Sequence, residues 1–369
     1  MSGTGRLNKD IYAKQSSKSG IVFHQGDVLY GKLRPYLQNW LLPTFDGLAV
    51  GDFWVLQPQN ADSSFLYRLI QSRQFDEVAN QSTGTKMPRA DWKLVSKTVF
   101  SIPSNISEQA AIGTYFTALD SLITLHQRKF EKLTNVKKSM LEKMFPQNGS
   151  SYPEIRFKGF TDPWEQRKLA SLCEKFTDGD WIESKDQSDF GVRLVQTGNV
   201  GVAEYLDKPN NKKWISEDTF DRLHCEEVLP GDILISRLPE PAGRACIVPL
   251  LGTKMITAVD CTIVRTAPDM SNKFLVQYLS SQAYFDDVNT CLAGGTRQRI
   301  SRGNLANFNV PIPVKKSEQD AIGMFFGYLD NLITLHQRQT IVYAVIRSIR
   351  KVILAERQYF APPMVRKSP

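Results

Sequence analysis

Apolar residues recur at alternating steps of four and three over a long stretch of the chain. They are Ile112, Phe116, Leu119, Ile123, Phe130, Leu133, Met140 and Met144, with His126 and Lys137 in the two remaining places of the series. A period of 3.5 residues is typical of helices that pack lengthwise as a coiled coil. Asn105 followed by Glu108 predicts a capped start, and Pro146 predicts the end. We therefore expect a long helix over residues 105–145.

The chain repeats this pattern 210 residues later. Residues 107–128 read SEQAAIGTYFTALDSLITLHQR and residues 317–338 read SEQDAIGMFFGYLDNLITLHQR, so that 16 of 22 aligned positions are identical. A period this long is a whole duplicated unit and not a solenoid repeat. We expect a second helix over residues 315–356, with a shifted apolar register after Gln339. The linker at residues 146–163 is too short for a parallel return past a domain, so the two helices should be antiparallel.

A region of short β-type runs precedes each helix. The runs at 28–30 and 53–56 in the first region correspond to those at 233–235 and 261–264 in the second. The pattern predicts an α+β protein with two mixed α/β domains separated by two long antiparallel coiled-coil helices. The predicted boundaries are 1–104 for a partial first domain, 105–145 for the first helix, 146–163 for a linker, 164–314 for the second domain, 315–356 for the second helix and 357–369 for a C-terminal tail.

The composition is that of a globular protein with a basic surplus. The 369 residues are 41% hydrophobic and 10% aromatic, and the formal net charge is +8. A positive balance favours a polyanionic partner, because nucleic acid releases counterions when basic side chains bind it. The five cysteines form no CxxC pair, and no apolar window is long enough to span a membrane. We expect a cytoplasmic protein with no membrane contact.

Both domains place basic residues in a glycine-containing loop before the helix. Arginine and glutamine can hydrogen-bond bidentately to guanine and adenine edges, and hydroxyl side chains can hold phosphates. A solvated loop is the alternative for either copy alone, and recurrence in both domains counts against it. The candidate DNA-binding residues in these loops are Arg297, Gln298, Arg299 and Arg302 in the second domain and Lys86, Arg89 and Lys93 in the first. Outside the loops, Arg237 and Lys32 coincide in the alignment and are further candidates, with surface charges as the alternative.

Candidate catalytic chemistry is almost absent from the sequence. There is no Walker loop, no GxSxG elbow and no amino-methyltransferase motif. Glu183, Ser184 and Lys185, with Asp178 and Asp180 nearby, resemble the carboxylate and lysine set of metal-dependent nucleases, but the first domain has no equivalent. We predict no catalytic residues, no metal ligands and no enzymatic activity.

Histidines occupy equivalent places in the two helices, at His126 and His336. No carboxylate or cysteine recurs around them with metal-ligand spacing, which favours packed or hydrogen-bonded histidines.

Several motifs together resemble the specificity subunits of type I restriction-modification systems. They are the duplicated SEQ-AIG-LD-LITLHQR helix, its continuation KFEKLTNVKKSMLEKMFPQ, the junction PEIRFKGFTDPWEQRKL at 153–169, and the GDILISR and GGTRQRIS blocks. The resemblance implies two target recognition domains that read the halves of a bipartite double-stranded DNA sequence. It also implies that the helices dock modification (methyltransferase) subunits and that restriction (translocase and nuclease) subunits join the complex. S-adenosylmethionine, ATP and Mg²⁺ would belong to those partners, and this chain would hold no cofactor.

Two departures from the family pattern bear on function. The region before Ser107 is about 47 residues shorter than the corresponding region of the second copy, and the tail after Gln339 diverges from the first copy. A truncated or rearranged subunit that acts only as a protein-interaction scaffold is therefore an alternative to the DNA-recognition subunit. A self-contained nuclease using the cluster at residues 178–185 is a third hypothesis.

Overall fold

The computed structural model describes residues 5, 7, 19–81, 87–147, 149–295 and 298–356, and within α9 it leaves the side chains of Ala344 and residues 347–356 undescribed. The chain divides into two units. Unit 1 contains residues 1–129 and 335–369, and unit 2 contains residues 130–334. Within the described part of the chain, no helix is long and apolar enough to cross a membrane.

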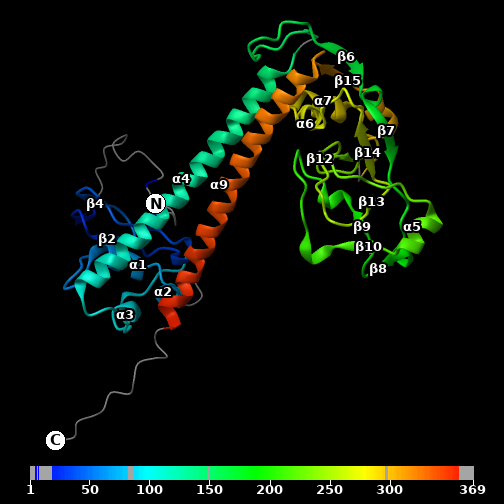
Figure 1. The fold of residues 1–369 in the computed structure, drawn as a ribbon. Coiled ribbons are helices and arrows are strands. Elements are labelled where there is room, and N and C mark those ends of the chain that lie inside the picture. Colours follow the sequence, from blue (N-terminus) through cyan, green and yellow to red (C-terminus); the bar gives the residue numbers. More distant parts are fainter. Residues whose placement is uncertain are drawn as a thin grey trace, which may run out of the picture. The chain divides into compact units, whose positions relative to one another are not determined.

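Two long helices carry the repeated motif, as predicted. Helix α4 spans Ile106–Met144 and α9 spans Lys316–Glu356. They lie side by side and antiparallel (Figure 1). In unit 2, Lys137 Nζ of α4 donates to Asp330 Oδ1 of α9 at 2.6 Å. Every apolar residue of the predicted seam in α4 is buried or half-buried, which agrees with lengthwise packing of the two helices.

The histidines of the two helices meet in unit 1. His126 Nδ1 and His336 Nδ1 lie 2.9 Å apart, and the ring of Tyr343 is 5.5 Å from that of His126. These two histidines are equivalent in the repeat, so their contact is the one expected at a local twofold axis between antiparallel helices. A hydrogen bond between the two Nδ1 atoms requires one ring to donate and the other to accept.

The second domain, in unit 2, is built on two four-stranded sheets. Their orders are β12-β11-β14-β7 and β13-β9-β10-β8, and a further pair joins β15 to β6. The strands are β6 (Glu165–Lys168), β7 (Cys173–Asp178), β8 (Gln187–Ser188), β9 (Val192–Val195), β10 (Lys213–Ile215), β11 (Ile233–Ser236), β12 (Ala245–Ile247), β13 (Met255–Thr257), β14 (Cys261–Thr266) and β15 (Asn309–Ile312). The helices are α5 (Glu217–Leu223), α6 (Asn272–Tyr278), α7 (Gln282–Thr290) and α8 (Arg302–Ala306).

Strand β11 lies at the centre of this domain because both of its faces are apolar. Ile233 and Ile235 point into a core shared with α6, α7 and the ends of α4 and α9. Leu234, between them, points to the opposite face, where it packs with Val195 and Met255 of the second sheet. A continuous apolar run of this kind is typical of a strand that is covered on both sides.

The described residues of the first domain, in unit 1, form a smaller set of elements. Its sheets are β3-β2-β5 and β1-β4, and three short helices accompany them. The elements are β1 (Ile21–Phe23), β2 (Val28–Gly31), β3 (Trp40–Leu41), β4 (Gly47–Ala49), β5 (Phe53–Leu56), α1 (Ser63–Leu69), α2 (Arg73–Ala79) and α3 (Trp92–Val95). Val28 and Tyr30 of β2 face the α1 and α2 side, and Leu29 faces the other, which is the alternation found in β11.

The Gly-Asp turn before each central strand has the same construction in both domains. Gly26 and Gly231 have φ angles of 94° and 95°, a left-handed conformation that glycine adopts without steric cost. The following aspartate accepts a hydrogen bond from the backbone N–H three residues before it, at 2.8 Å in both copies. The corresponding runs at 28–30 and 233–235 are therefore each preceded by the same turn.

Each domain is attached to its long helix by the same contact. Gly113 of α4 packs on Ser64 in α1, and Gly323 of α9 packs on Lys273 in α6. A Cβ atom at either glycine would lie 2.8 Å from a backbone carbon of the domain helix. Any side chain at these two positions would push the domain off its helix.

Substitution of Gly323 by alanine should destabilise the protein. The added methyl group would force the first turn of α6 away from α9, and overpacking of this kind costs about 1–3 kcal/mol. Gly327 is a matched control on the same helix, because a Cβ there meets open space. Gly327→Ala should be neutral or stabilising by about 0.5–1 kcal/mol through helix propensity. Denaturant unfolding of both variants measures the difference, and equal stabilities would contradict the contact.

Stability should fall as the pH is lowered from 7 to 5. Burial lowers the pKa of His126 from its usual 6.5, and the neighbouring charges of His336 and Lys129 lower it further. Below pH 6.5 the unfolded chain therefore binds a proton that the folded chain resists, so acid favours unfolding. The double variant His126→Gln/His336→Gln should lose part of this pH dependence in thermal unfolding. His24→Gln should retain it, since His24 lies away from the helix pair.

Candidate nucleic-acid interface

The basic residues of the second domain gather where β11 ends. The backbone N–H of Arg237, directly after β11, donates to the carbonyl of Asp260 at 2.9 Å, and the carbonyl of Arg237 accepts from Ile300 at 3.1 Å. The chain segments around 237, 260 and 300 are therefore held together by main-chain hydrogen bonds. This brings the predicted arginine loop to the end of the central strand.

Asp178, at the end of β7, is the carboxylate at the centre of this cluster. Its Oδ1 lies 3.5 Å from Arg237 Nε, and its Oδ2 lies 3.7 Å from Arg302 Nε. Thr262 Oγ1 also donates to Asp178 Oδ1 at 2.9 Å. Asp178 thus orients two of the predicted arginines.

Arg237 does not have the position that we predicted for a direct DNA contact. It is only 5% exposed, and its guanidinium donates to the carbonyl of Val259. Main-chain hydrogen bonds with Asp260 and Ile300 fix its backbone between two chain segments. Its side chain is therefore buried beneath the loop and is not on the surface. The sequence could not show this, because the depth of Arg237 is set by residues more than 20 positions away. The structure supports a positioning role for it.

The other arginines of the loop are open to solvent. Arg299 is half-exposed, and its nearest acidic partner is Asp260, with 3.8 Å between Nη2 and Oδ1. Arg302 is also half-exposed. It is the first residue of α8 and directly follows the N-cap residue Ser301. Gln298 is exposed. Arg297 lies outside the described residues.

The first domain repeats this arrangement with fewer residues. The backbone N–H of Lys32 donates to the Asp52 carbonyl at 2.9 Å, and its carbonyl accepts from Ala90, as in the second domain. Asp52 lies 3.2 Å from Arg89 and 3.9 Å from Lys32. Lys32 thus takes the place of Arg237, Asp52 that of Asp260 and Arg89 that of Arg299.

Two predicted residues of the first domain remain to be placed. Lys93 lies in α3 with an exposed side chain. Lys86 lies outside the described residues.

Sequence reasoning missed the carboxylates Asp52 and Asp260, and it named Asp178 only as part of the nuclease alternative and not as a partner of Arg237 and Arg302. Asp52 and Asp260 stand directly before the β5 and β14 runs that we had aligned, so a search for acids at matching places would have found that pair. Asp178 has no counterpart in the first domain.

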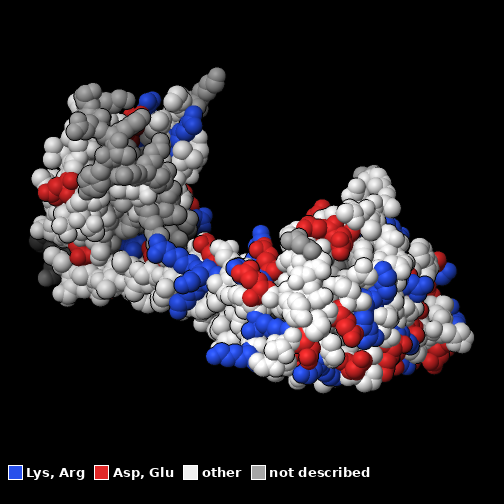
Figure 2. Space-filling model, turned by 90° about the horizontal axis from the view of Figure 1, so that it is seen from above, with Lys and Arg blue, Asp and Glu red and all other residues white. Residues whose placement is uncertain are grey.

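The ion pairs of Arg299 with Asp260 and of Arg302 with Asp178 are loose, at 3.8 and 3.7 Å, and both arginines are about half-exposed. Pairs of this kind contribute about 0–1 kcal/mol, so an arginine can leave its carboxylate for another acceptor at little cost. Among the described residues on the face seen in Figure 2, basic and acidic side chains are interspersed. The local clusters, more than the overall charge, are therefore the candidates for specific contacts.

The residues proposed for the nuclease alternative do not form a metal site. Asp180 accepts from the backbone N–H of Glu226 at 2.9 Å, and burial raises its pKa. Glu183 pairs with Lys185 at 2.8 Å, while Asp178 faces the arginines. Among the residues that the structure describes, no group of three or more potential metal ligands occurs.

Comparison with known proteins identifies the family. Residues 161–342 match the family described as the type I restriction modification DNA specificity domain. The chain belongs to the type I restriction-modification specificity subunits. Family membership agrees with our prediction that the chain recognises DNA and is not an enzyme.

Two curated specificity subunits show the extent of the similarity. The type I restriction enzyme MjaVIII specificity subunit of Methanocaldococcus jannaschii is 22% identical over 323 residues, which are 82% of this chain and 75% of the relative. The EcoDI specificity subunit of Escherichia coli is 27% identical over 128 residues, or 33% of this chain and 28% of that protein.

Solved structures show the same fold. The S subunit of a type I restriction-modification system from M. genitalium aligns with a TM-score of 0.61 at 13% identity, covering 96% of this chain and 87% of that one. A chain from a study of complex assembly and conformational transition of the type I system aligns with a TM-score of 0.51 at 19% identity, covering 93% and 84%. The predicted α+β fold, with two domains and two long helices, is thereby confirmed.

Proposed function

We propose that this specificity subunit reads a bipartite double-stranded DNA sequence through the two basic clusters, one in each domain. The observation that carries the proposal is the repetition of the cluster. Two domains that share only limited sequence keep the same main-chain hydrogen bonds and the same acid–base pair, Asp260 with Arg299 and Asp52 with Arg89. The same geometry at the end of the central strand of both domains supports the same role for each domain, which is to read one half of the DNA sequence.

The carboxylates favour base reading over plain attraction to phosphate. A carboxylate next to an arginine offsets part of its positive charge and therefore weakens binding to the DNA backbone. The planar guanidinium can exchange this loose contact for a bidentate one with a guanine edge. Arg299, with exposed Gln298 beside it, is the leading candidate for a base contact in the second domain. Arg89 has the same place in the first domain.

The partners follow from the same proposal. The long helices would dock modification subunits that methylate adenine with S-adenosylmethionine, and restriction subunits would supply ATP- and Mg²⁺-dependent translocation and cleavage. This chain would contribute only the recognition of the DNA sequence. The complex would act in the cytoplasm. Co-expression with the modification subunit, followed by genome-wide mapping of methylated adenines, would reveal the target. A methylated bipartite target would also separate this function from that of a scaffold that does not read DNA.

Replacing Arg299 by alanine should weaken binding to the mapped target. If the guanidinium reads a base edge, the loss should be about 1–3 kcal/mol on the cognate half-site, with random DNA little affected. A phosphate contact would instead weaken both and reduce the salt slope by about one unit. A fluorescence-anisotropy titration at several salt concentrations distinguishes the two.

Arg222→Ala provides the matched control for this titration. Arg222 is a half-exposed arginine of the same domain that pairs with Asp186 outside the cluster, at 2.9 Å, so its loss should leave affinity for the target unchanged. The proposal would be contradicted if Arg299→Ala, Arg302→Ala and the double variant all kept the affinity and salt dependence of the unaltered chain. This result would show that the loop does not contact DNA.

A further inference from the structure

The connection between β9 and β10 of the second domain contains three lysines that take no part in the arginine cluster. They are Lys208, Lys212 and Lys213, and the short 3-10 helix Pro209–Asn211 lies between the first two. Lys208 and Lys212 are exposed, and Lys213 is half-buried. We call residues 208–213 the lysine loop. Its three positive charges lie close together along the chain, on one connection of the domain.

The charges of the lysine loop are not offset by carboxylates. None of the three lysines forms an ion pair with a residue that the structure describes, although Glu204 and Asp207 directly precede the loop. Arg237, Arg299 and Arg302 of the arginine cluster, by contrast, each lie beside an aspartate. An ammonium group without a carboxylate partner keeps its attraction for an anion. The lysine loop is therefore better suited than the arginine cluster to bind phosphate.

A buried arginine adds a further positive charge beneath the loop. Arg193 of β9 is 3% exposed and has no ion pair within the described part of the chain. Its Nη1 donates to the carbonyl of Lys213 at 2.8 Å, and its guanidinium lies 5.5 Å from the centre of the Trp214 ring. Salt screens a buried charge less than an exposed one, so Arg193 strengthens the positive potential at the base of the loop.

Arg244 holds the segment before the lysine loop against the end of β11. Its guanidinium donates four hydrogen bonds of 2.7–3.0 Å to main-chain carbonyls, two in the segment after β9 and two in the segment after β11. The four carbonyls are those of Thr197, Val200, Leu238 and Pro241. The segment after β11 begins with Arg237 of the arginine cluster. The joint made by Arg244 therefore connects the two basic elements.

The side chain of Lys208 returns to this joint. A Cβ atom at Gly198 would lie 2.8 Å from Lys208 Nζ. Gly198 directly follows Thr197, whose carbonyl accepts from Arg244. The Lys208 ammonium group thus lies at the same joint as the segment that begins with Arg237. The lysine loop and the arginine cluster are neighbouring but separate elements of one domain.

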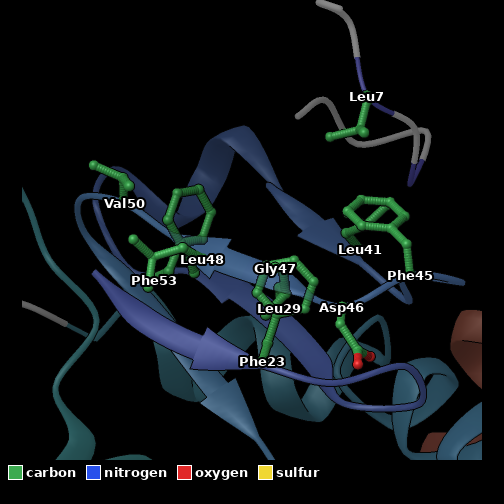
Figure 3. Close-up of a pocket in the computed structure, with 11 residues that line it drawn as sticks. Leu7, Phe23, Leu29, Leu41, Phe45, Asp46, Gly47, Leu48, Val50 and Phe53 are labelled. Atoms are coloured by element: carbon green, nitrogen blue, oxygen red, sulfur yellow. The ribbon is translucent and has the colours of Figure 1, made fainter. Parts of the chain in front are cut away.

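The pocket of unit 1 has the opposite character. It has a volume of about 360 Å³, and its lining is mainly apolar, with side chains such as Phe23, Leu41 and Phe53 (Figure 3). Asp46 is the charged group among its described lining residues, which include no lysine or arginine. A carboxylate repels phosphate, so this pocket is not a candidate for contact with the DNA backbone.

We propose that the lysine loop is a second DNA contact of this domain, which binds backbone phosphates and does not read bases. The proposal rests on the proposed function, because it takes the arginine cluster as the element that reads bases. A lysine ammonium group binds phosphate as a point charge, and phosphate contacts position a protein on the duplex without selecting a sequence. The arginine cluster would then supply discrimination, and the lysine loop would supply affinity for any DNA.

An acidic protein surface is the other class of partner that would attract these lysines. The joint made by Arg244 favours DNA, because it places the lysine loop next to the segment that carries the arginine cluster. A duplex bound at the arginines would bring its backbone to the neighbouring surface of the same domain.

The test is a titration of the full-length chain with the double substitution Lys208→Ala/Lys212→Ala. Fluorescence anisotropy at several salt concentrations measures its affinity for the mapped target and for a random duplex of the same length. We expect the same fold-loss on both duplexes, because phosphate contacts do not depend on sequence. The slope of log affinity against log salt concentration should become smaller by about two units, one for each phosphate contact.

The variant Lys158→Ala/Lys168→Ala is the matched control, since it removes the same charge from unit 2. Lys168 lies in β6, at the end of the domain next to the long helices, whereas β10 lies at the opposite end (Figure 1). All four substituted lysines are exposed, so both variants should fold as the unaltered chain does. The control should keep the salt slope of the unaltered chain.

Three results would overturn the proposal. An unchanged salt slope in Lys208→Ala/Lys212→Ala would show that the loop does not bind phosphate. An equal decrease in the control would show a response to net charge alone. Unchanged DNA binding together with loss of the modification subunit on size-exclusion chromatography would assign the loop to a protein partner.

The same titration separates this proposal from the proposed function. Equal affinity of the unaltered chain for the target and the random duplex would reject sequence reading, and the slope on random DNA would still test the loop. An intact preference for the target with an unchanged slope in the loop variant would reject the lysine loop alone.

Discussion

The close contact between a helix glycine and a domain helix is the constraint on which each half of this structure depends. Gly113 and Gly323 let the main chain of α1 and α6 approach the long helices to a distance that no other residue permits. Around each glycine, polar side chains complete the joint. Gln109 and Gln319 each accept from the backbone at the start of the domain helix and donate to a proline carbonyl six residues upstream. The joint uses mainly the backbone of the domain, so the domain sequence can vary around it.

This joint explains why the helix motif is nearly identical in the two copies while the domains are not. The motif also contains Asp120 and Asp330, which bind Arg68 and Gln277 at equivalent places on α1 and α6. Glutamine, glycine and aspartate are spaced along the helix so that they face the domain. The basic loops lie at the other end of the central strand and are free to change without loss of the attachment.

The sequence predicted the helices, their antiparallel pairing and the two mixed domains, because those depend on periodicity and on a long repeat. It did not predict which basic residues are exposed. Arg237 and Arg299 look alike in the sequence, but only the fold places Val259 and Asp178 around the first and leaves the second half-exposed. Asp52 and Asp260 directly precede runs that correspond in the sequence, but only the fold shows that each lies beside an arginine of a later loop, Arg89 at 3.2 Å and Arg299 at 3.8 Å.

Glu108 and Glu318 show that an identical motif can serve two environments. A carboxylate as buried as Glu318 is tolerable only because Arg156 and the Trp164 ring nitrogen bind it, since an unpaired buried charge is strongly unfavourable. Glu108 remains in solvent and needs no such partner. The glycine, glutamine and aspartate contacts, by contrast, are complete in both units. Attachment of a domain to its helix is therefore independent of the ion pair that accompanies the burial of Glu318.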